Sequence, residues 1–312
     1  MSGRPRVLAI VGPTAVGKTA LALDLAETLG GEIVSADSIQ VFRGMDIGSA
    51  KPTPEERERV PHFGIDVAEP DEPFSAGRYA ALAADAIESI RGRGRIPLIV
   101  GGSGLYIRAL LTGLASGLDP DPEVRLRIAE RLAREGVGAI RRRLEEVDPQ
   151  TAARIHEGDV YRLTRAIEVH EMTGRPLSEH QAAHGWRGGR YDPVWIGLTE
   201  EKPVLVARIE ARCDEMIARG LRDEVQGLMA RGFHLDLRPL RSLGYKQMGD
   251  VLRGACALED AVAEMKKATR RYAKRQLTWF RANADIPWFS PSRAREAIRR
   301  RALQAFPERG DR

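Results

Sequence analysis

The 312-residue sequence lacks most of the features that mark secreted or membrane proteins. Its two cysteines, Cys213 and Cys256, lie far apart and indicate neither a disulfide framework nor a metal-ligand pair. No apolar run is long enough for a transmembrane helix, and the opening MSGRPRVLAIVG lacks the long apolar core of a signal peptide. We therefore expect a cytoplasmic protein with no membrane segment, and we take it to be a monomer.

The histidines show no spacing typical of a metal site, and the sequence contains no internal repeat or low-complexity tract. A hydrophobic content of 43% and a charged content of 30% are ordinary for a globular protein. The net charge of +5 favours an anionic partner. The alternative is that arginine is simply abundant throughout the chain.

Short apolar runs alternate with helical patterns in the first third of the chain. RVLAIV at residues 6–11, GEIVSADS from Gly31 and IPLIV from Ile96 have the composition of buried parallel strands. Helical spacing follows from Lys18 to a capping Gly30, and again over residues 74–95. This alternation predicts a doubly wound α/β core that binds ligands beyond the carboxyl ends of its strands.

The pattern becomes purely helical after Leu118, where LDPDPEVRLRIAERL begins with the Asp and Pro typical of a helix start. A strand-like run, PVWIGLT, returns at residues 193–199, and long helices are expected at 203–231, interrupted at Gly220, and at 258–282. We therefore predict a core formed by residues 1–118 and 191–312, with a helical insertion at residues 119–190.

GPTAVGKT, between the first strand and the first helix, fits the phosphate-binding pattern G-x-x-x-x-G-K-T in full. Backbone N–H groups of such a loop converge on phosphate oxygens, and the lysine adds a positive charge. The core is therefore expected to resemble that of the P-loop NTPases. The candidate anion-binding residues are Gly12, Pro13, Thr14, Ala15, Val16, Gly17, Lys18 and Thr19.

The acidic magnesium ligand that ATPases place at the end of a later strand is missing, because IPLIV continues into Gly101, Gly102 and Ser103. The nearest strand-end carboxylate is Asp37, in SADS. A diphosphate ester suits a phosphate-binding loop with one strand-end carboxylate better than a triphosphate does. Asp37 is then free to act as a base. Alternatively, Asp37 caps a helix or assists a Mg²⁺ ion bound through Thr19.

Six segments occur in an order that resembles the bacterial tRNA dimethylallyltransferases. They are GPTAVGKT, SADSIQVFRGMDIGSAKPT, GGSGLYIRALLTGL, RIEARCDEMIARGLRDEV, RSLGYKQ and YAKRQLTWFR, and the similarity extends from about Val7 to Trp288. The resemblance implies transfer of a dimethylallyl group from dimethylallyl diphosphate to N6 of adenosine 37, beside the anticodon of a tRNA. It also implies that Mg²⁺ accompanies the diphosphate and that the anticodon stem-loop binds the protein.

The resemblance assigns catalytic roles to Asp37 as general base and to Lys18, Thr19 and Ser103, with Thr19 as the candidate metal ligand. Arg208 and Arg212 lie four residues apart, so they share one face of a predicted helix. Two guanidinium groups on one face suit a diphosphate, although a solvated surface is equally consistent with the spacing. The resemblance favours an arginine of this segment as a diphosphate ligand and leaves open which one.

Residues expected to contact tRNA follow from the same resemblance and from clusters of basic residues beside aromatic ones. Tyr161 replaces a glutamine that is commoner in the family, and its ring could stack on a base. Trp279 and Phe280 are interpreted as core residues. The expected tRNA contacts are Asp37, Ser38, Ile39, Gln40, Ser103, Arg125, Tyr161, Arg162, Leu163, Thr164, Arg165, Arg241, Ser242, Leu243, Gly244, Tyr245, Lys246, Lys274 and Arg275.

Two other functions use some of the same features. A small-molecule kinase would bind ATP on the loop and would use the arginine-rich insertion as a lid, but it needs a further acidic magnesium ligand. A non-catalytic RNA-binding module would use the loop only for regulation, and an intact loop beside a strand-end Asp37 argues against it.

Overall fold

The computed structural model describes residues 3–115, 118–185 and 189–307. The chain divides into two compact units, Met1–Leu111 with Gly189–Arg312 and Thr112–Gly188. Each unit has its own cluster of buried apolar side chains. No helix in the described part of the chain is both long and apolar enough to cross a membrane.

The first unit is built on a six-stranded parallel sheet, which confirms the predicted α/β class. Its strands are ordered β3-β2-β4-β1-β5-β6. The four long strands, β1 (Arg6–Val11), β2 (Gly31–Ala36), β4 (Ile96–Gly101) and β5 (Asp192–Leu198), occupy the positions expected from their apolar runs. β1 lies between β4 and β5, so the loop after it starts in the middle of the sheet.

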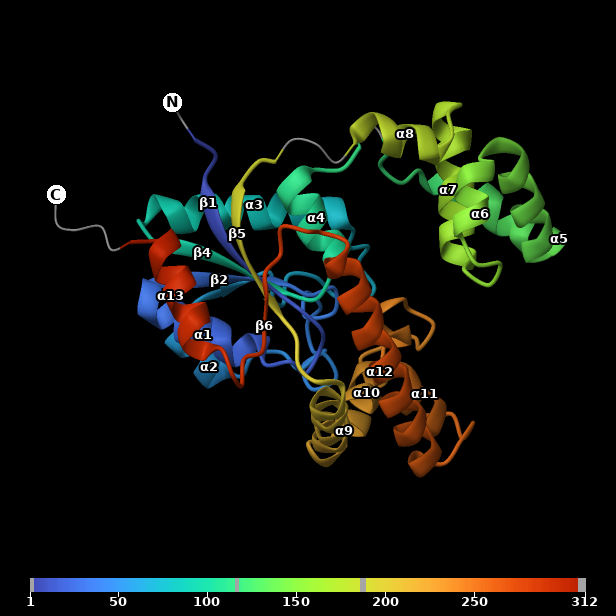
Figure 1. Ribbon diagram of the computed structural model, residues 1–312. Coiled ribbons are helices and arrows are strands. Elements are labelled where there is room, and N and C mark those ends of the chain that lie inside the picture. Colours follow the sequence, from blue (N-terminus) through green and yellow to red (C-terminus); the bar gives the residue numbers. More distant parts are fainter. Residues whose placement is uncertain (1–2, 116–117, 186–188, 308–312) are drawn as a thin grey trace. The chain divides into compact units, whose positions relative to one another are not determined.

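Helices cover both faces of this sheet. α1 (Lys18–Leu29) and α13 (Arg295–Ala305) lie on one face, and α3 (Ala76–Gly92) lies on the other (Figure 1). α1 ends at Gly30, whose φ of 63° is in the left-handed region that glycine adopts without steric cost. α2 (Pro54–Arg59) and α4 (Gly104–Thr112) complete the N-terminal half.

A cluster of helices follows β5. α9 (Lys202–Ala218) and α10 (Leu221–Ala230) are separated at Gly220, as predicted. A short 3₁₀ turn, η1 (Pro239–Arg241), leads into α11 (Tyr245–Leu252), and α12 (Leu258–Arg281) packs against both α9 and α11. Hydrogen bonds between α12 and residues that follow β1 and β4 place this cluster at the carboxyl edge of the sheet.

Two strands of the sheet were not predicted. β3 (His62–Phe63) and β6 (Trp288–Phe289) have two residues each, which is too short to show any hydrophobic period. They form only because the neighbouring strands β2 and β5 are already in place to pair with them. Tertiary context, not local pattern, determines these two edges.

The second unit is entirely helical in its described residues. It contains α5 (Pro122–Val147), which is interrupted at Gly136 with a φ of 77°, α6 (Pro149–Arg154), α7 (Val160–Thr173) and α8 (Leu177–His184). Its core contains Val124, Ile128, Ile140, Leu144, Ala152, Leu163, Ala166 and Ile167. Leu163 is fully buried there, so the expectation that it contacts tRNA is wrong.

Candidate active site

The loop between β1 and α1 has a backbone that requires glycine at two positions. Gly12 has a φ of 149°, and a Cβ atom there would lie 2.5 Å from the carbonyl oxygen of Leu198. Gly17 precedes α1 with a φ of 103°, again in a region that L side chains rarely adopt. The turn therefore delivers the first amides of α1 to the carboxyl edge of the sheet, where a helix N-terminus attracts anions.

Lys18 folds back over this loop. Its Nζ donates hydrogen bonds to the carbonyl oxygens of Gly12, at 3.0 Å, and Pro13, at 2.7 Å. Burial, together with the positive charge of Arg212, lowers the pKa of Lys18 from 10.5 to about 7, and the negative charge of Asp37 partly opposes this shift. The ammonium group is thus held at the loop, where a bound anion would stabilise its charged form.

Asp37 follows β2 directly and forms a tight turn. Its Oδ1 accepts hydrogen bonds from the backbone N–H of Ile39, at 2.8 Å, and of Gln40, at 3.3 Å. The carboxylate also acts electrostatically on Lys18 of the loop and on Arg212 of α9. The structure therefore brings together three residues that lie far apart in the sequence.

Ser103 joins Asp37 from the end of β4. Its backbone N–H donates to the Ala36 carbonyl oxygen at 3.1 Å, and its Oγ accepts from the backbone N–H of Ser38 at 3.0 Å. The two bonds bracket Asp37 on either side along the chain. The Ser103 hydroxyl is consequently a structural neighbour of the carboxylate.

α9 presents its two arginines differently. Arg208 donates to the carbonyl oxygen of Val16 at 3.4 Å and lies 3.7 Å from a carboxylate oxygen of Glu200. Arg212 has no hydrogen bond or ion pair within the described residues, although burial lowers its pKa. A desolvated guanidinium group without a partner beside Lys18 is a strong candidate anion ligand.

Two further residues of the site, Gln276 and Tyr272, were not predicted from the sequence. Gln276 of α12 accepts a hydrogen bond from the Thr14 backbone N–H and donates one to the Gly102 carbonyl oxygen. Tyr272, one turn earlier, lies beside Gln276 and Ser103, and burial raises its pKa, so its phenol stays neutral. The two hydrogen bonds of Gln276 join residues 262 and 174 positions apart, which no local pattern reveals.

The amide of Gln40 is used within the protein. Its Oε1 accepts from the Ser35 hydroxyl at 2.8 Å, and its Nε2 donates to the carbonyl oxygens of Ser49 and Ala50 at 3.3 and 3.1 Å. These contacts hold the segment after Asp37 in place. They favour a positioning role for Gln40 over the base-edge contact expected from the sequence.

The RSLGYKQ segment corrects another expectation. Tyr245 is fully buried and its hydroxyl donates to Glu224 at 2.7 Å, so it is not available to RNA. Arg241 and Lys246 are exposed, and Lys246 pairs with Asp250 at 3.3 Å. Both line a hollow of about 130 Å³ with Leu235, Asp236, Leu240, Gly249 and Arg253.

Within the helical unit, the basic residues expected to contact RNA have acidic partners. Arg125 and Arg165 both pair with the buried Glu168, at 2.9 and 2.8 Å. Arg162 pairs with Asp159 at 2.7 Å, and the Thr164 hydroxyl donates to the Val160 carbonyl oxygen. The ring of Tyr161 is exposed, as a stacking role requires.

The aromatic pair near the end of α12 separates. Phe280 is buried, but Trp279 is 42% exposed, so its interpretation as a core residue is wrong. The guanidinium group of Arg108 lies 4.5 Å from the centre of a Trp279 ring. Lys274 and Arg275 are exposed on the same helix, with Arg275 over the ring of Tyr272.

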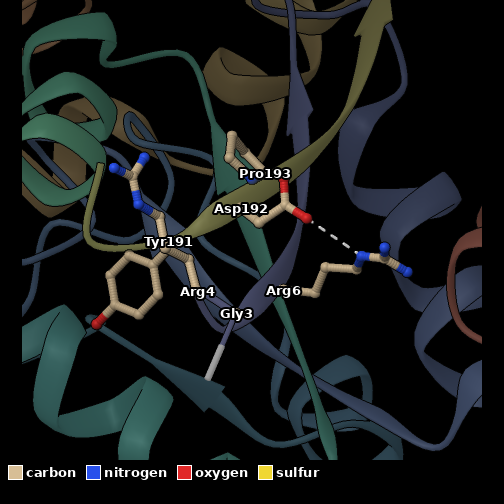
Figure 2. A pocket seen from close by; sticks show the side chains of 6 residues that line it. All are labelled: Gly3, Arg4, Arg6, Tyr191, Asp192 and Pro193. Atoms are coloured by element: carbon tan, nitrogen blue, oxygen red, sulfur yellow. Dashed lines mark hydrogen bonds and ion pairs between the residues drawn. The ribbon is translucent and has the colours of Figure 1, made fainter. Parts of the chain in front are cut away.

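A hollow of about 540 Å³ lies at the opposite edge of the sheet, at the amino ends of β1 and β5 (Figure 2). Gly3, Arg4, Arg6, Tyr191, Asp192 and Pro193 line it, and Arg6 donates to Asp192 at 3.2 Å. None of the expected site residues lies there. Parallel sheets bind ligands at their carboxyl edge, so size alone does not make this hollow the site.

Family comparisons agree on one group of enzymes. Residues 40–283 match the family model for IPP transferase, and residues 5–69 match that for isopentenyl transferase. The chain is 49% identical over 291 residues to a tRNA dimethylallyltransferase of Syntrophobacter fumaroxidans, covering 92% of this chain and 85% of that protein. It is 48% identical over 295 residues to that of Desulfosudis oleivorans, covering 95% and 94%.

Solved structures give the same result. The full-length tRNA isopentenylpyrophosphate transferase of Bacillus halodurans superposes with a TM-score of 0.70 at 41% identity, covering 97% of this chain and 96% of that one. A eukaryotic dimethylallyltransferase acting on tRNA gives a TM-score of 0.79 at 27% identity, covering 96% and 78%.

Proposed function

The chain belongs to the IPP transferase family, and from that premise we propose that it transfers a dimethylallyl group from dimethylallyl diphosphate to the N6 amine of adenosine 37 in tRNA. The observation that carries the proposal is the pairing of an anion-binding loop with one strand-end carboxylate. Lys18 and Arg212 supply positive charge, and Asp37 lies within electrostatic reach of both.

The loop and its cations serve the leaving group. As the allylic C–O bond breaks, negative charge grows on the departing diphosphate, and fixed N–H groups and cations stabilise that charge. Lys18 and Arg212 are the proposed ligands, with Arg208 bonded to the loop itself. The Thr14 backbone N–H is already bonded to Gln276, so the amides nearer Gly17 are the better phosphate donors.

Asp37 is the proposed general base. The N6 amine of adenine is a weak nucleophile because its lone pair is delocalised into the ring. As the C–N bond forms, the amine loses one proton, and we assign that proton to the Asp37 carboxylate. Oδ1 accepts hydrogen bonds from two backbone N–H groups. Oδ2 has no hydrogen bond within the described residues, so it is the oxygen that we expect to accept the proton.

A magnesium ion fits this site only together with the substrate. No group of three or more His, Cys, Asp or Glu side chains in the described residues could hold a metal. Mg²⁺ is commonly bound through one or two protein oxygens and the phosphates of a ligand. The Thr19 hydroxyl is the proposed protein ligand, and the ion would neutralise charge on the diphosphate.

The tRNA is proposed to bind through its anticodon stem-loop. The exposed Lys274 and Arg275 of α12 are suited to backbone phosphates, and the exposed ring of Tyr161 is suited to a base. Because tRNA is the proposed substrate, the cytoplasm is the compartment that we propose, with a monomer as the working unit.

Product analysis tests this function. The purified chain is incubated with unmodified tRNA and either dimethylallyl diphosphate or ATP, each with Mg²⁺, and the digested nucleosides are identified by mass spectrometry. We expect N6-dimethylallyl adenosine with the first donor and no phosphorylated product with ATP. A phosphorylated product would favour the kinase alternative, and tRNA binding without any product would favour the RNA-binding module.

A further inference from the structure

One buried side-chain amide lies between the two halves of the proposed active site. Gln276 of α12 is 6% exposed. Its Oε1 accepts a hydrogen bond from the Thr14 backbone N–H at 2.9 Å, and its Nε2 donates to the Gly102 carbonyl oxygen at 3.1 Å. Both ends of the amide are therefore bonded, one to the phosphate-binding loop and one to the end of β4.

The approach of this amide to β4 is unusually close. A Cβ atom at Gly102 would lie 2.1 Å from Gln276 Nε2 and 3.4 Å from the Gly12 carbonyl oxygen. No larger residue fits there without displacing the amide or the loop. Gly102 thus makes room for Gln276. This explains why a glycine follows β4 at the position where ATPases carry an acidic magnesium ligand.

The connection continues from β4 to the base. Ser103, next to Gly102, bonds to the backbone on both sides of Asp37, through the Ala36 carbonyl oxygen and the Ser38 N–H. The phenol of Tyr272 lies beside both Gln276 and Ser103. A continuous series of contacts therefore runs from the loop, through Gln276 and the end of β4, to the turn that holds Asp37.

We propose that Gln276 is a positioning residue that fixes the separation between the diphosphate-binding loop and the general base Asp37. The proposal rests on the proposed function, because that separation matters only if leaving group and base act in one reaction. Displacements of about 1 Å between reacting groups can lower rates by about a hundredfold. An apolar residue of similar size would fill the space but would leave the Thr14 N–H and the Gly102 carbonyl oxygen unpaired.

Gln276→Met tests the proposal, because it keeps the volume and removes both hydrogen bonds. Glu264→Gln, an exposed change about three turns earlier on α12, is the control. We expect Gln276→Met to lower kcat by about 10- to 100-fold, and to change the dissociation constant for inorganic diphosphate less than about threefold. Gln276→Glu keeps the acceptor for Thr14 but places a carboxylate oxygen against the Gly102 carbonyl oxygen, so it should also lower kcat.

A second readout does not depend on catalysis. Hydrogen exchange of the intact chain should become at least about fivefold faster in the peptides that cover both the loop and the turn after Asp37, and stay unchanged in Glu264→Gln. Unchanged exchange in both segments, or a kcat equal to that of the unsubstituted chain, would overturn the proposal. A parallel collapse of kcat, diphosphate binding and thermal stability would also overturn it, since it would indicate a general structural role.

The two proposals fail in different ways. If the unsubstituted chain forms no prenylated adenosine, the proposed function is wrong, and the exchange experiment still decides whether Gln276 holds the loop and the turn together. If product forms normally and Gln276→Met behaves like the control, only the positioning role is wrong.

Discussion

At the scale of single residues, the proposed site concentrates positive charge on side chains that are partly buried. Lys18 interacts only with carbonyl oxygens of its own loop through hydrogen bonds, and Arg212 has no bonded partner among the described residues. Such groups are costly to bury unless an anion binds them. The site is therefore prepared for its ligand at the expense of its own stability.

The pKa of Lys18, lowered by burial to about 7, makes diphosphate binding depend on pH. Below pH 7 the ammonium form dominates and the affinity is fully present. Above pH 7 the free protein loses this proton, and binding must restore it because the anion raises the pKa of Lys18. The dissociation constant for inorganic diphosphate should then rise by up to about tenfold per pH unit, as titration calorimetry can measure.

Lys18→Arg is the matched control for this titration, because a guanidinium group stays charged throughout the range. Its dissociation constant should lack the rise above pH 7. A wild-type profile as flat as that of the arginine variant would show that Lys18 is fully protonated in the free protein.

Residues of the site that belong to one continuous motif could be predicted from the sequence. The loop from Gly12 to Thr19 and the carboxylate Asp37 follow directly from strand ends. Gln276 could not be predicted, since its partner Thr14 is 262 positions away. Tyr245 was misassigned because a glycine turn beside basic residues looks the same in sequence whether its aromatic side chain points outward or inward.

At the scale of elements, a single carboxylate joins the segment after Asp37 to the C-terminal helices. Glu224 of α10 accepts hydrogen bonds from the backbone N–H of Asp46, Ile47 and Gly48, at 3.0, 2.7 and 3.2 Å. It accepts a fourth bond from the Tyr245 hydroxyl on α11. A Cβ atom at Gly48 would lie 2.5 Å from the Tyr245 ring, so the turn is closely packed against α11.

Removing the charge of Glu224 should destabilise the first unit. In Glu224→Gln the amide offers one acceptor oxygen to three backbone donors, so we expect the free energy of unfolding to fall by about 2–3 kcal/mol. Tyr245→Phe removes one of the four bonds and should cost about 1–2 kcal/mol. Equilibrium unfolding in urea measures both changes.

The neighbouring exposed residue provides the control. Asp223→Asn also removes one negative charge from the first turn of α10, and it should cost no more than about 1 kcal/mol. Equal losses for Asp223→Asn and Glu224→Gln would show that the helix dipole, and not the turn at residues 46–48, accounts for the effect.

Elements with a long apolar or amphipathic pattern were predicted well, and elements defined by their neighbours were not. The four long strands and helices α1, α3, α9, α10 and α12 follow from hydrophobic period and glycine caps. The short strands β3 and β6 pair only with edges that other parts of the chain create. Short helices such as α8, whose described residues include none that is buried, give no periodic signal.

At the scale of the whole molecule, the net charge of +5 is consistent with a nucleic-acid substrate, but its distribution matters more. Arg125, Arg162 and Arg165 are paired with acidic residues, so they contribute less free charge than their number suggests. Lys274 and Arg275 are exposed, and neither forms an ion pair with an acidic side chain among the described residues.

The salt dependence of tRNA binding should identify which cations contact phosphate. Each contact releases about one counterion, so Lys274→Gln with Arg275→Gln should lower the slope of log affinity against log salt by about 1.4–1.8. Replacing the exposed Arg299 and Arg300 of α13 by glutamine removes the same charge and should leave the slope unchanged. Equal slopes for both double variants would place the RNA elsewhere.

Asp37→Asn separates the binding of diphosphate from the removal of the proton, so it is the decisive test of Asp37 as the general base. In single-turnover measurements with tRNA and dimethylallyl diphosphate, we expect a rate lower by about 10²–10⁴-fold. The dissociation constant for inorganic diphosphate should stay within about threefold of the unsubstituted value, since Asp37 repels rather than binds the anion. A transfer rate close to that of the unsubstituted chain would show that Asp37 is not the general base.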